Sequence, residues 1–78
     1  MARLPSLKPR EVVRALERLG YKTIRQKGSH LFMWTPGRSP VVVPMHRKDV
    51  KPGTLSSLLR GAGIERDEFL AALKKRPK

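Results

Sequence analysis

The sequence has no cysteine and is poor in acidic and aromatic residues. Without cysteine, the chain forms neither disulfide bonds nor a thiolate metal site. No apolar run approaches the roughly 20 residues that a membrane-spanning helix needs, and the N-terminus lacks the apolar stretch of a signal peptide. With 78 residues, we expect one cytoplasmic domain over residues 1–78, near the lower size limit for an unaided hydrophobic core. Residues 1–8 and 75–78 are expected to be a loosely ordered leader and tail.

The few acidic residues are unevenly placed. The chain has 18 lysines and arginines against 6 aspartates and glutamates, which gives a formal net charge of +12. No acidic residue occurs between Arg18 and Lys48, and three acids lie together within residues 65–68. A long basic window favours phosphate backbones as partners. We therefore prefer a nucleic-acid partner to the simpler alternative, a highly soluble protein with scattered surface lysines.

Periodicity and turn residues predict an α+β domain. The predicted elements are a helix from Pro9 to Gly20, strands over 21–27, 30–35 and 40–44, a helix from Pro52 that ends at 61–63, and a short helix after Ile64. This order describes a three-stranded antiparallel sheet with helices on one face and with its other face open.

The second predicted strand is apolar on both faces. By alternation, one face carries His30, Phe32 and Trp34, and the other carries Leu31 and Met33. Alternation alone does not say which face the helices cover. The two aromatic residues are therefore either core side chains or, on an open face, platforms on which unpaired bases stack.

A turn at Gly28-Ser29 is predicted to place His30 at the corner between two strands. Gly28 suits a tight turn because it accepts a positive φ, and Ser29 can brace the turn with a local side-chain hydrogen bond. In the basic strand before the turn, Ile24 is the expected apolar anchor. Because His30 opens the next strand, the sheet fixes the direction of its side chain.

His30 and His46 are the two histidines of the chain, and neither occurs in a metal-ligand spacing or beside a phosphate-binding loop. An imidazole in a cationic field can take and give a proton near neutral pH. RNA supplies its own nucleophile, the 2′-hydroxyl, so cleavage needs a base and cations but no metal or other cofactor. His30 would be that base or acid. The candidates for binding RNA are Arg25, Lys27, His46, Arg47 and Lys48.

Each of these assignments has a simpler structural alternative. A histidine that begins a strand is often only a hydrogen-bonded structural residue, and His46 is more typical of a solvated or phosphate-contacting loop residue than of a catalyst. Two other functions remain open: a non-catalytic RNA-binding module, and a small ribosome-associated or DNA-binding structural protein. Strand scission that depends on the 2′-hydroxyl would distinguish a nuclease from both.

Four segments resemble the HicA toxin family, in order and with compatible spacing. They are Leu-Glu-Arg-Leu-Gly-Tyr at 16–21, Gln-Lys-Gly-Ser-His at 26–30, Val-Pro-Met-His at 43–46, and a segment at 51–64 that begins Lys-Pro-Gly-Thr-Leu. The resemblance implies a fold similar to double-stranded-RNA-binding domains. It also implies a toxin of a type II toxin–antitoxin system, an mRNA-cleaving endoribonuclease that a HicB-type antitoxin neutralises. In that family the histidine of Gly-Ser-His is catalytic, which implies His30 here, supported by Gly28 and Ser29.

Overall fold

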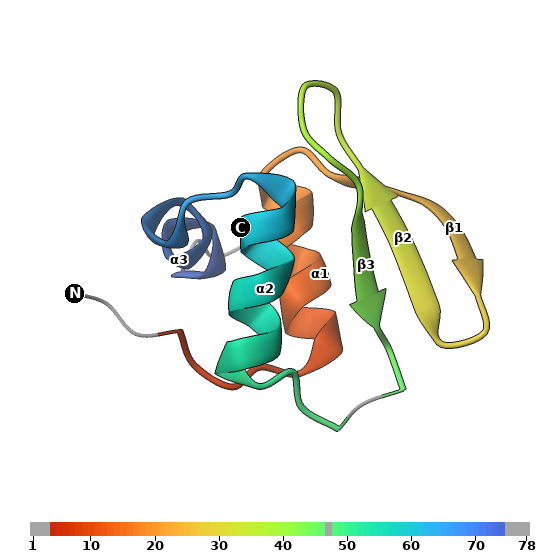
Figure 1. Ribbon diagram of the computed structural model, residues 1–78, viewed down its shortest axis with the longest axis horizontal. Helices are drawn as coiled ribbons and strands as arrows, with labels where there is room; N and C mark the ends of the chain where they lie inside the picture. Colours follow the sequence, from red (N-terminus) through yellow and green to blue (C-terminus); the bar gives the residue numbers. More distant parts are fainter. Residues whose placement is uncertain (1–3, 47, 75–78) are drawn as a thin grey trace.

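The computed structural model describes residues 4–46 and 48–74. Its elements are, in chain order, α1 (Pro9–Arg18), β1 (Lys22–Lys27), β2 (His30–Trp34), β3 (Val41–Pro44), α2 (Pro52–Ala62) and α3 (Arg66–Lys74). Figure 1 shows three layers: the antiparallel sheet, the pair α1 and α2 beside it, and α3 on the far side of that pair. The predicted α+β fold is confirmed. Within the described ranges, no helix is long and apolar enough to cross a membrane.

Both α1 and α2 end in a Schellman motif, at the glycines where the sequence predicts that the helices stop. The Tyr21 N–H donates to the carbonyl of Leu16 at 3.0 Å, and the Ile64 N–H donates to the carbonyl of Leu59 at 2.9 Å. In each motif the glycine before the donor adopts a left-handed φ, of 98° and 72° respectively. The side chain that follows each glycine is thereby turned into the core, where Tyr21 and Ile64 are buried.

β2 is the central strand of the sheet and has neighbours on both sides. Leu31 and Met33 are buried beneath the helices. Because side chains alternate along a strand, His30, Phe32 and Trp34 lie on the opposite face, away from α1, α2 and α3. The structure thus answers the question that the alternation of β2 left open.

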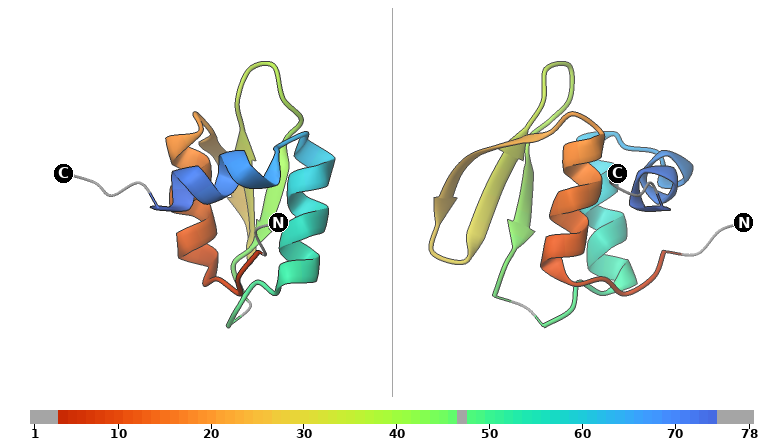
Figure 2. Two further views of the ribbon diagram at one scale, coloured as in Figure 1. Left: turned by 90° about the vertical axis from the view of Figure 1, so that its left-hand side faces the viewer. Right: turned by 180° about the vertical axis from the view of Figure 1, so that it is seen from behind.

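β1 is an edge strand, and every residue in it is exposed. A bulge between Thr23 and Arg25 leaves Ile24 without a cross-strand partner, and this residue is 55% exposed. The expectation that Ile24 anchors the first strand is therefore wrong. Figure 2 shows the reason: the helices lie against the β3 side of the sheet, and β1 extends beyond them.

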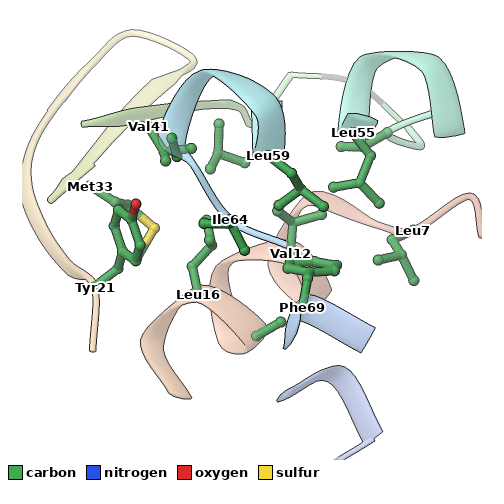
Figure 3. Close-up of a cluster of buried hydrophobic side chains, with 14 of the residues drawn as sticks. Leu7, Val12, Leu16, Tyr21, Met33, Val41, Leu55, Leu59, Ile64 and Phe69 are labelled. Carbon is green, nitrogen blue, oxygen red and sulfur yellow. The ribbon is translucent and has the colours of Figure 1, made fainter. Parts of the chain in front are cut away.

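The core fills the space between the sheet and the helices (Figure 3). Its largest fully buried side chains include Tyr21, Phe69, Leu16, Met33 and Leu55. Leu4 and Leu7 are also buried, and the Leu7 N–H donates to the carbonyl of Val50 at 3.1 Å. This part of the expected loose leader thus packs into the core, whereas 1–3 and 75–78 lie outside the described residues.

Two arginines connect α3 to the rest of the domain. Arg18 donates from Nη1 to the carbonyls of Ala72 and Leu73, at 2.9 and 3.3 Å. Arg38, in the loop between β2 and β3, forms a two-pronged ion pair with Glu68. The hydrogen bonds from this guanidinium lower the pKa of the Glu68 carboxyl below its ordinary value.

We expect Glu68→Gln to lower the melting temperature near neutral pH and to lose this effect in acid. A carboxyl whose pKa is lower in the folded state contributes stability above its unfolded-state pKa, and this contribution disappears as the pH falls through the folded-state value. Thermal denaturation from about pH 7 to about pH 3 should therefore show the two melting temperatures converging. Glu17→Gln, on the exposed side of α1, is the control. A difference that persists undiminished in acid would contradict this role of the ion pair.

Candidate active site

A two-residue turn connects β1 to β2 and places His30 at the first position of β2. Gly28 has a φ of 59°, whereas Ser29 has a negative φ, which is the pattern of a type II′ turn. The side-chain amide of Gln26 donates from Nε2 to the carbonyl of Gly28 at 3.0 Å. Lys27 and His30 then face each other as the first cross-strand pair. The turn therefore presents an exposed imidazole directly opposite a lysine.

The second histidine lies beside the first. β3 pairs with β2 so that Pro44 is opposite His30, and the Met45 N–H continues the ladder by donating to the carbonyl of Ser29 at 2.7 Å. His46 follows directly, and the centroids of the two imidazole rings are 6.2 Å apart with the ring planes inclined at 62°. Among the residues that the structure describes, neither ring forms a side-chain hydrogen bond or an ion pair.

The open face of the sheet combines cations with aromatic rings. Arg25 pairs with Phe32 across the strands, and its guanidinium lies 5.4 Å from the centroid of that ring. This geometry is a cation–π contact. Lys22 pairs with Trp34 across the same two strands, and Trp34 is 41% exposed. The alternative that this tryptophan is a core side chain is thus excluded.

Basic side chains continue from His46 towards the start of α1. One shallow depression is lined by His46, Lys48, Asp49 and Lys51. A second shares Lys48 with the first and is otherwise lined by Lys8, Pro9, Arg10, Glu11, Arg14 and Met45. The carboxylate of Glu11 accepts a hydrogen bond from the Lys8 N–H at 2.9 Å, so it is engaged in starting α1. Basic side chains thus line the surface from the end of the sheet, at His46, to α1.

The acidic residues are mostly elsewhere. Asp67 and Glu68 belong to α3, the layer on the far side of the molecule from the sheet (Figure 1). Asp49 is the acid nearest to His46 along the chain, and it lines the first depression described above. In residues 4–46 and 48–74, no group of three or more histidine, cysteine, aspartate or glutamate side chains is arranged to hold a metal ion.

The structure therefore brings together most of the residues singled out in the sequence. Gly28, Ser29 and His30 form one corner, with Lys27 across from the histidine. Arg47 lies outside the described residues. Sequence reasoning missed the proximity of the two histidines, because this proximity depends on the register between β2 and β3. It also missed the contribution of α1 to the basic surface.

Residues 9–64 match the protein family described as HicA toxin of bacterial toxin-antitoxin. The chain belongs to this family. The match confirms the resemblance found in the sequence, and it spans α1 through α2 together with both histidines. The protein is thus a toxin of a toxin–antitoxin system. A comparison with curated proteins found no match.

Proposed function

We propose that this HicA toxin is a metal-independent endoribonuclease that cleaves mRNA, with His30 moving the proton. The observation that carries the proposal is the exposed imidazole of His30 on an open, basic sheet face, opposite Lys27. A buried ring or one paired with a carboxylate would have favoured a structural role. Membership of the HicA family supports the proposal independently.

The proposed reaction uses the nucleophile that RNA carries. His30 removes the proton of a 2′-hydroxyl, whose oxygen attacks the neighbouring phosphorus atom. Negative charge then accumulates on the phosphoryl oxygens, and positioned cations stabilise it. Lys27 and Arg25 share the open face with His30. Lys48 lines the same depression as His46. These cations fit that task, and Arg47 is a further candidate from the sequence.

The open face fits single-stranded RNA. Aromatic side chains bind unpaired bases by stacking, without a fixed sequence preference. Phe32 and Trp34 lie on the same face of β2 as His30. Trp34 is four residues from His30 along the strand, a distance of about 13 Å at the usual rise of a strand. A base stacked on Trp34 would thus belong to a neighbouring nucleotide and not to one of the two that the cleaved bond joins.

The expected protein partner is a HicB-type antitoxin that covers this basic surface. A partner for a surface with so many cations should present acidic groups, and the association should weaken with increasing salt. An mRNA substrate also places the toxin in the cytoplasm.

Incubation of the pure protein with labelled single-stranded RNA in the presence of a chelator tests the proposal. We expect cleavage that leaves a 2′,3′-cyclic or 3′-phosphate and a 5′-hydroxyl, because the 2′-oxygen is the attacking atom. An RNA with one deoxyribose at the scissile position should bind with similar affinity and stay intact. Loss of activity with chelator or 5′-phosphate products would contradict the mechanism. Binding of RNA without scission would instead support a non-catalytic RNA-binding module. A preference for DNA over RNA would support a DNA-binding protein.

A further inference from the structure

The two histidines lie at the same end of the sheet. His30 opens β2 and is paired with Pro44, the last residue of β3. His46 lies two residues beyond Pro44, in the turn that follows β3. The hydrogen bond from Met45 to Ser29 holds the two backbones together at this point. The 6.2 Å between the ring centroids is therefore a consequence of strand pairing.

Transfer of a phosphoryl group from one oxygen to another needs two proton movements. The attacking 2′-oxygen loses a proton, and the leaving 5′-oxygen gains one. The two oxygens lie on opposite sides of the phosphorus atom in an in-line displacement, so two separate groups serve them better than one. Each group must come within about 2.6–3.2 Å of its oxygen.

The arrangement of the two rings fits this requirement. With their centroids 6.2 Å apart and their planes inclined at 62°, the rings of His30 and His46 lie edge to face and not stacked flat, close enough for both to reach one phosphate group. Both residues are exposed. Gly28, in the turn next to His30, has no side chain, and an added Cβ there would meet nothing within 4 Å, so the turn leaves space beside His30.

We propose that His46 is a second catalytic residue, the general acid that protonates the leaving 5′-oxygen while His30 deprotonates the 2′-hydroxyl. This inference rests on the proposed function. The proton of the 2′-hydroxyl passes to His30, the bond from O2′ to phosphorus forms, the bond from phosphorus to O5′ breaks, and the proton of the His46 imidazolium passes to O5′. The products are a 2′,3′-cyclic phosphate and a 5′-hydroxyl. Exchange of protons with water then restores both rings.

A substrate with a sulfur atom in place of the bridging 5′-oxygen tests this assignment. A thiolate is a far weaker base than an alkoxide and leaves without being protonated. We expect His46→Ala to cleave ordinary RNA about 10²–10⁴-fold more slowly than wild type and to cleave the sulfur-containing RNA at nearly the wild-type rate. His30→Ala should be impaired on both substrates, because the 2′-hydroxyl must still lose its proton.

Lys48→Ala is the matched control, since Lys48 lies in the same depression as His46 and is a candidate phosphate ligand. A residue that only binds phosphate should lose activity equally on both substrates. The assignment would be overturned if His46→Ala lost the same factor of activity on both substrates, or if it cleaved ordinary RNA at the wild-type rate. It would also be overturned if the sulfur-containing RNA restored the activity of His30→Ala and not that of His46→Ala. His46→Gln should reproduce the alanine result if the alanine variant proves unstable. Failure of the wild type to cleave any RNA would instead refute the proposed function itself.

Discussion

Replacement of His30 by alanine is expected to slow RNA cleavage by about 10²–10⁴-fold, the usual loss when a positioned acid or base is removed. The loss should appear in kcat, with a nearly unchanged KM, because Arg25 and Lys27 can still hold the substrate. The imidazole is exposed, and among the described residues it forms no side-chain hydrogen bond. Its removal leaves no buried polar group unsatisfied, so the melting temperature should stay close to that of the wild type.

Thr23→Ala is a suitable control for His30→Ala. Thr23 is exposed on the neighbouring strand β1, and it pairs with Met33, on the face of the sheet opposite to His30. Its cleavage rate and its ability to arrest growth when expressed should equal those of the wild type. Cleavage and growth arrest by His30→Ala at wild-type levels would show that another group moves the proton.

Replacement of Phe69 by alanine is expected to lower the free energy of unfolding by about 3–5 kcal/mol. Phe69 lies on α3 and is fully buried against the core (Figure 3). A domain of this length has a total stability of about 4–12 kcal/mol, so this one change removes a large part of it. The melting temperature should fall by on the order of 20 °C.

Ile24→Ala is the control for Phe69→Ala. It also removes a large apolar side chain, but Ile24 is 55% exposed on the bulge of β1. Its free energy of unfolding should change by less than about 1 kcal/mol. Urea denaturation of the wild type, Phe69→Ala and Ile24→Ala measures these changes in the free energy of unfolding. The family match ends at residue 64, before α3 begins. If Phe69→Ala were as stable as the wild type, α3 would not unfold together with the rest of the domain.

The element order was predictable because its signals are local. Proline at the first position of α1 and α2, and glycine after their last turns, act on the backbone of the residues beside them. The turn at Gly28 is of the same kind, since a positive φ there favours glycine whatever surrounds it. These features therefore hold before any long-range contact forms.

Burial was less predictable because it depends on what packs against each residue. Ile24 has an apolar side chain but lies on an edge that the helices do not reach. Leu4 and Leu7 precede the first helix in a segment without periodicity, yet both are buried. Glu68 has an evident local role near the start of α3, but its partner Arg38 is 30 positions away.

By itself, the sequence determined the order of the elements, the corner that carries His30, the basic character of the chain and its resemblance to the HicA family. These follow from short spacings and from composition, which act over a few residues at a time. Only the tertiary structure decided which face of β2 is open and how close the two histidines lie, with their ring centroids 6.2 Å apart. Both depend on the packing of the helices and on the register of β3, and strand pairing brings together residues that the chain keeps far apart.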